Sequence, residues 1–124
     1  SAAEGTTLGL TYSILEDAGQ VPAVKDFISW YERTNPGADI DFFAIMSWAA
    51  ADLYVDALRS VQGPPTRDKV LAALQATTDF DADGILAGVN PAQKKGSSCF
   101  MIAEVKGGKW VRTHPAQGFD CSYA

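Results

Sequence analysis

The hydrophobic pattern over residues 41–62 predicts a long helix with two different halves. The first half is apolar on nearly every side, with only Ser47 suited to contact water. In the second half a polar stripe recurs at helical spacing, formed by Asp52, Asp56, Arg59 and Ser60. A helix that is apolar all round has to be covered all round. We therefore expect more neighbours over the first half than one sheet face supplies.

The same kind of pattern predicts the elements around this helix. Residues 7–13 alternate apolar and polar side chains, which is typical of a half-buried strand. Pro22 opens a second stretch with helical spacing, and Thr66 is suited to cap a third. Asp39 or Asp41 can cap the long helix, because a carboxylate there accepts backbone N–H groups.

The C-terminal third predicts a loop followed by a hairpin. Residues 79–98 are rich in turn-forming residues and predict a long irregular connection, with one short strand near residues 85–89. A loop of this length is usually functional or packed on something. Gly107 and Gly108 favour a two-residue turn that would place Val105 opposite Trp110.

The predicted order is one strand, three helices and a hairpin, which indicates the α/β class. A complete α/β domain normally alternates strands and helices. We therefore expect residues 1–124 to form a single partial domain.

Composition narrows the classes of partner. The chain is 47% hydrophobic and 20% charged, as in ordinary globular proteins, and its net charge is -5. Nucleic acids and anionic membrane surfaces are therefore not expected as partners. No apolar run approaches the ~20 residues of a membrane span.

Two cysteines, Cys99 and Cys121, bracket the predicted hairpin. They are too far apart for a redox CxxC motif and too few for a zinc site. A disulfide is the simplest interpretation and would indicate an oxidising compartment. Two unpaired thiols are the alternative.

Asp79, Asp81 and Asp83, followed by Gly84, resemble the opening of a calcium loop. The twelfth position of such a loop, where a glutamate is expected, is Asn90. A plain turn is the preferred interpretation, and calcium remains the alternative.

Catalysis is not expected from this sequence. His114 is the only histidine, and no serine lies in the context of a nucleophile elbow. We expect a protein that is not an enzyme and that needs no cofactor.

An ordered series of motifs covers nearly the whole chain. It consists of Val-Pro-x-Val-x-x-Phe at residues 21–27, Trp-Ala-Ala at 48–50, Thr-Arg-x-x-Val-x-x-Ala-Leu at 66–74, and an ending with Gly-Lys-Trp-Val at 108–111 and Gly-Phe-Asp-Cys at 118–121. The series resembles the C-terminal part of periplasmic solute-binding proteins of the branched-chain amino acid type. These proteins are the receptor subunits of ABC importers.

The resemblance implies a two-lobed, hinged protein that closes on a small, amino acid-like solute outside the cytoplasm. The solute and the importer's membrane subunits would be its partners, and this chain would supply only the last part of the fold. By position, Phe43 matches the aromatic residue that lines the family's cleft, and Phe42 and Tyr12 are weaker candidates. The alternative for all three is a place in the core or between the lobes.

A different class of function is also open. The chain could be a free-standing interaction module that buries the apolar face of helix 41–62 in a homodimer, because an uncovered apolar patch marks an interface.

Overall fold

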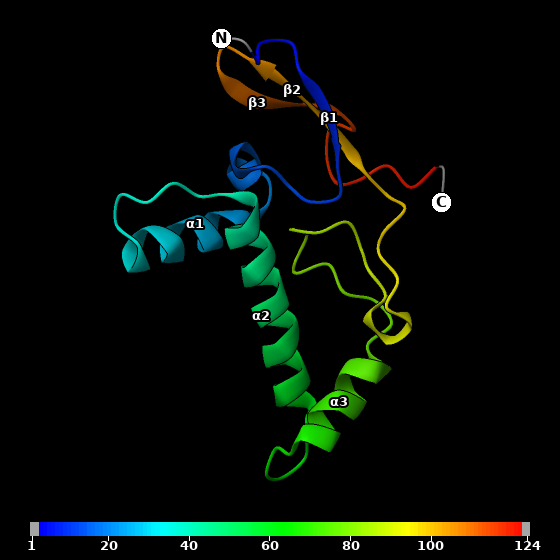
Figure 1. The fold of residues 1–124 in the computed structure, drawn as a ribbon. Helices are drawn as coiled ribbons and strands as arrows, with labels where there is room; N and C mark the ends of the chain where they lie inside the picture. Colours follow the sequence, from blue (N-terminus) through cyan, green and yellow to red (C-terminus); the bar gives the residue numbers. More distant parts are fainter. Residues whose placement is uncertain (1–2, 123–124) are drawn as a thin grey trace.

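The computed structural model describes residues 3–122. Within that range a three-stranded antiparallel sheet lies at one end of the molecule, and α1, α2 and α3 extend away from it (Figure 1). The strands, in sheet order, are β1 (Thr7–Leu10), β2 (Met101–Lys106) and β3 (Lys109–His114). Between β1 and β2 the chain forms η1 (Leu15–Gly19), α1 (Pro22–Thr34), α2 (Phe42–Ser60), α3 (Arg67–Ala76) and η2 (Pro91–Gln93). The predicted strand, three helices and hairpin are confirmed as a small mixed α/β fold.

The sheet joins the two ends of the chain. β1 pairs with β2, and β2 pairs with β3 through the predicted hairpin, in which Val105 lies opposite Trp110. Gly107 and Gly108 have φ values of 60° and 76°, as their two-residue turn requires. The predicted first strand is shorter than expected. It ends at Leu10, and Tyr12 forms only an isolated bridge.

Side-chain caps fix the beginnings of two helices. The Asp41 carboxylate accepts a hydrogen bond from the Ala44 amide at 2.8 Å, so Asp41 rather than Asp39 caps α2. The Thr66 hydroxyl accepts a bond from the Lys69 amide at 3.4 Å and caps α3, as predicted. These bonds satisfy amide groups that have no partner inside the helix.

The larger core lies where α1 and α2 meet the loop that follows α3. Its buried residues are Val24, Phe27, Ile45, Ala49, Ala82, Ile85 and Leu86. The Phe27 ring contacts the Trp48 ring with their centroids 5.6 Å apart. One face of the first half of α2 is thus covered by α1 and by this loop.

The loop in that core corrects one expectation. No regular strand forms over residues 85–89 in the part of the chain described. Phe80 and Val89 form an isolated bridge, and Leu86 forms another with Tyr12. The chain turns sharply here because Ala82, Asp83 and Gly84 all adopt positive φ. Its apolar side chains enter the core instead of forming one side of a strand, which confirms that this loop packs on the rest of the molecule.

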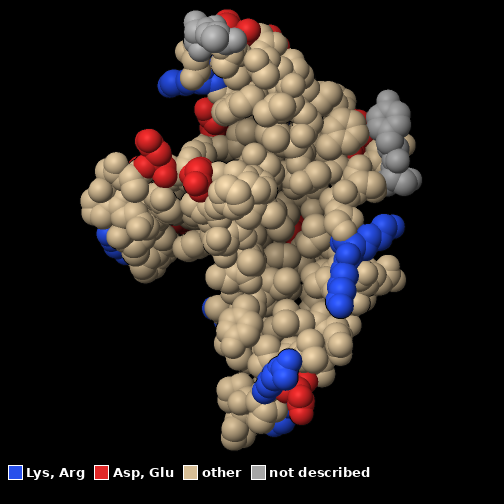
Figure 2. Space-filling model, in the orientation of Figure 1, with Lys and Arg blue, Asp and Glu red and all other residues tan. Residues whose placement is uncertain are grey.

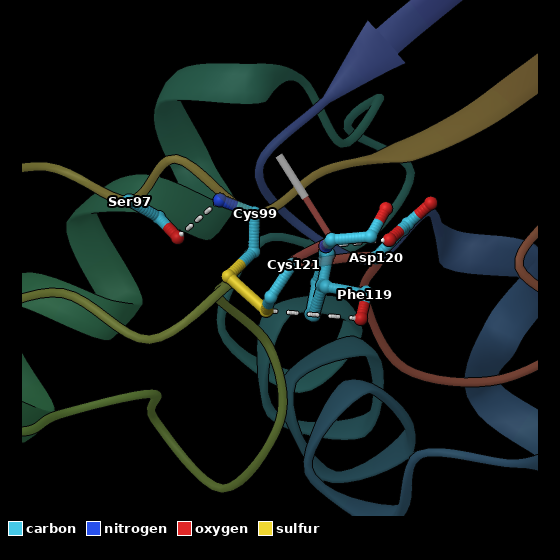
Figure 3. The surroundings of a disulfide bond; sticks show 6 residues. Ser97, Cys99, Phe119, Asp120 and Cys121 are labelled. Carbon is cyan, nitrogen blue, oxygen red and sulfur yellow. Dashed lines mark hydrogen bonds between the residues drawn. A yellow bond between two sulfur atoms is a disulfide. The ribbon is translucent and has the colours of Figure 1, made fainter. Parts of the chain in front are cut away.

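The second, smaller core lies under the sheet. Ile14, Met101 and Ala103 are buried there, and Trp110 and Phe119 pack against them. The predicted disulfide between Cys99 and Cys121 is present, with an S–S distance of 2.07 Å (Figure 3). It fastens the C-terminal tail to the segment that enters β2.

The polar stripe on the second half of α2 is largely exposed. Asp56 and Arg59 form a surface ion pair at 3.2 Å. Asp52 is half-buried, and this burial raises its pKa, with a further rise from the nearby carboxylates of Asp56 and Asp83. Over residues 3–122, no helix is both long enough and apolar enough to cross a membrane.

Candidate functional site

The three aromatic residues singled out from the sequence lie together at the start of α2. The rings of Tyr12 and Phe42 have centroids 5.2 Å apart, and those of Phe42 and Phe43 are 5.4 Å apart. Phe43 is 73% exposed and Phe42 is 46% exposed, whereas Tyr12 is half-buried. The sequence predicts that the first half of α2 is covered on all sides. The structure covers one face only, because Phe42 and Phe43 remain open to solvent in this chain.

A pocket of about 190 Å³ lies beside this aromatic cluster. It is bounded by β1, η1, the start of α2 and one residue of β3. Its aliphatic walls are Leu8, Leu10, Ile14, Leu15, Ile40 and Ile45. Tyr12, Phe42 and Trp110 supply its aromatic walls, and Glu16 and Asp41 supply carboxylates. Phe43 does not line this pocket.

The ionised groups around the pocket are acidic. Glu16 Oε1 accepts a hydrogen bond from the Trp110 amide at 3.2 Å, and Asp41 Oδ1 caps α2. Burial raises the pKa of Tyr12 above its usual value of 10.0. Among the residues the structure describes, no Lys or Arg lines the pocket. In Figure 2 acidic atoms are visible between the sheet at the top and α1 at the left, with basic atoms above them at the edge of the sheet.

Two of these lining residues were missed as candidates in the sequence. Glu16 falls in the stretch between the first predicted strand and the first predicted helix, where η1 turns it toward β3. Trp110 was expected only as the partner of Val105 across the hairpin. The one sequence signal for Glu16 was its place between a predicted strand and a predicted helix, because binding residues often lie on such connections.

The residues of the calcium alternative lie in the loop that follows α3. Within residues 3–122 no three His, Cys, Asp or Glu side chains gather closely enough to hold a metal ion. Asp79, Asp81 and Asp83 are all exposed. The turn is closed by its own backbone, because the Asp81 carbonyl accepts a bond from the Leu86 amide at 2.8 Å.

The small mixed α/β fold thus places an open pocket with aromatic walls between the sheet and the start of α2. A family model described as periplasmic binding protein matches residues 1–109, which is most of the chain. The chain therefore belongs to the periplasmic binding protein family. No curated protein and no solved structure matches it. The family and the Cys99–Cys121 disulfide both fit an oxidising, extracytoplasmic compartment.

Proposed function

We propose that this chain is the C-terminal part of a two-lobed solute-binding protein of the branched-chain amino acid type. The whole protein captures an amino acid-like solute by hinge closure and delivers it to the membrane subunits of an ABC importer, without making or breaking a bond. Membership of the family supports a solute-binding role. The ordered motif series supports the finer assignment.

The observation that carries the proposal is the open aromatic cluster at the start of α2. Large apolar side chains exposed side by side mark a binding surface, and Phe42 and Phe43 are exposed in this way. The adjoining pocket, at about 190 Å³, is smaller than the ~300–1,000 Å³ of complete small-molecule sites. A second surface closing over it would complete such a site.

The test is solute binding by the full-length protein that carries this chain, measured by titration calorimetry against a panel of amino acids. Phe42→Ala is expected to weaken the tightest binding by about tenfold, because it removes an aromatic wall. Tyr54→Ala is the matched control. Tyr54 is a 51% exposed aromatic on the same helix and lies outside the pocket. No binding of any amino acid, or equal losses in the two variants, would contradict the proposal.

A homodimeric interaction module is the second candidate, favoured by the 73% exposure of Phe43. Sedimentation velocity separates the two functions. If the protein binds no solute and forms a dimer that Phe43→Ala converts to a monomer, then self-association is the function and the solute-capture proposal is wrong.

A further inference from the structure

One buried ion pair joins two of the elements that form the walls of the pocket beside α2. Asp17 on η1 and Arg112 on β3 have side chains that are 4% and 7% exposed. The guanidinium donates to both carboxylate oxygens, with the bond from Nε at 3.0 Å. Neither residue lines the pocket. Any effect of the pair on binding therefore passes through the elements that it joins.

The pocket takes walls from both of these elements. Leu15 and Glu16 directly precede Asp17 on η1 and line the pocket. Trp110 lines it from β3, two positions before Arg112 and so on the same face of the strand. A second bond joins the elements, from the Trp110 amide to Glu16 at 3.2 Å, but Glu16 is exposed and water competes for that bond. The buried ion pair is the better shielded of these two links.

The two partners also make bonds beyond the pair. Asp17 Oδ2 accepts the Ile14 amide at 3.2 Å, at the beginning of η1. Arg112 Nη1 donates to the Gly118 carbonyl at 2.6 Å, in the C-terminal tail. A guanidinium presents its donors in a fixed planar fork, so bonds from all three of its nitrogens set its orientation as well as its place.

Such a pair contributes geometry besides stability. Removing one partner of a buried pair is costly, yet an apolar pair of the same volume often stabilises a fold equally well. A fork of two parallel bonds between guanidinium and carboxylate adds a defined relative orientation, which apolar contacts do not. Between η1 and β3, that orientation sets how the wall with Leu15 and Glu16 faces the wall with Trp110.

We infer that Asp17 and Arg112 are positioning residues for this pocket, because their ion pair holds its η1 wall against its β3 wall. The inference rests on the proposed function, since it assigns how the site of that function keeps its shape. Without the fork the two walls can move apart. Binding a solute then has to restore their arrangement, which lowers the affinity.

Arg112→Lys tests the inference in the full-length protein that carries this chain. Lysine keeps a positive charge beside Asp17 but cannot form the fork. Titration calorimetry with the amino acid that binds most tightly in the panel is expected to show about tenfold weaker binding.

Val70→Ala is the control for lost stability, because Val70 is buried on α3 and lies outside this pocket. A protein that stays folded keeps its affinity even when it has lost stability, so this control is expected to bind as the unaltered protein does. Unchanged affinity in Arg112→Lys, or an equal loss in Val70→Ala, overturns the inference.

Hydrogen exchange follows the two walls without any solute. In Arg112→Lys the backbone amides of η1 are expected to exchange about tenfold faster relative to those of α3, because η1 opens locally once the fork is lost. Asp17→Asn tests the pair from its other side. It keeps one oxygen for the Ile14 amide and is expected to have the same effect. Urea unfolding shows that each variant is folded, and unchanged exchange over η1 in both variants contradicts the inference.

The two proposals fail in distinguishable ways. If an amino acid binds and Phe42→Ala weakens its binding while Arg112→Lys does not, the proposed function stands and the positioning inference falls. If no amino acid binds, both fall.

Discussion

The helical end and the sheet end of this molecule are stabilised in different ways. Among the described residues, seven form the buried cluster between α1, α2 and the loop after α3, and only three form the cluster under the sheet. The sheet end instead carries a disulfide, a buried ion pair and side-chain bonds to its turn. Glu4, for example, accepts the Gly107 amide at 2.8 Å.

The difference shows how a small domain with few apolar residues can stabilise two separate regions by different interactions. Burial of apolar area stabilises the helical end. At the sheet end, a cross-link and charged hydrogen bonds take over part of that role, as in other small domains with limited cores. The pocket lies where the two ends meet, so both kinds of interaction position its walls.

The largest effect is expected from truncating the helical core. Phe27 is 1% exposed, and its ring contacts Trp48. Phe27→Ala is expected to lower the free energy of unfolding by about 3–5 kcal/mol, because it removes apolar contacts and leaves a cavity. Urea unfolding followed by tryptophan fluorescence measures this change.

Phe43→Ala is the matched control for that measurement. The same substitution at a largely exposed position on α2 is expected to change stability by no more than about 0.5 kcal/mol. If the two variants lost similar stability, the exposed aromatic cluster would belong to the core, and the contrast between the faces of α2 would be wrong.

The next effect concerns the buried ion pair of the sheet end. Arg112 and Asp17 have side chains only 7% and 4% exposed, and the guanidinium bonds both carboxylate oxygens. Arg112→Leu leaves a buried carboxylate without its partner and is expected to cost about 3 kcal/mol in urea unfolding.

A double variant separates the cost of the unpaired Asp17 charge from the cost of the changed packing at position 112. Adding Asp17→Asn to Arg112→Leu removes the unpaired charge and is expected to restore part of the stability. A single variant as stable as the unaltered protein would show that polar contacts contribute little to the sheet end, and the comparison between the two ends would fail.

Local features of the fold could be predicted from the sequence because local interactions specify them. The Asp41 and Thr66 caps, the Gly107–Gly108 turn and the opposed pair of Val105 and Trp110 all depend on residues close in the chain. The aromatic candidates came from the family resemblance, and the structure brings them together. Their role in binding stays a prediction.

Features that depend on distant segments could not be predicted in this way. The amide of Ser13 donates to the Ile85 carbonyl at 2.7 Å across some seventy positions of chain, and this pairing places the loop in the core. The pocket likewise forms only when Glu16 from η1 meets Trp110 from β3. A linear pattern gives the polarity of each such residue but not its distant partner.

The smallest effect is expected at the C-terminal tail of the sheet end, where it appears as a dependence on pH. The hydrogen bond from His114 and the Ser122 amide lower the pKa of Asp120 from its usual 3.8 to about 2. A carboxyl group with a lowered pKa in the folded state stabilises the fold above its unfolded pKa, and this contribution is lost as pH falls through the folded value.

Asp120→Asn should therefore cost stability at pH 7, with the difference from the unaltered protein shrinking between about pH 4 and 2. Urea unfolding at several pH values measures it, and in a His114→Ala background the cost at pH 7 should be smaller. A difference that is constant from pH 7 to 2 would mean that the ionised Asp120 does not help to hold the tail.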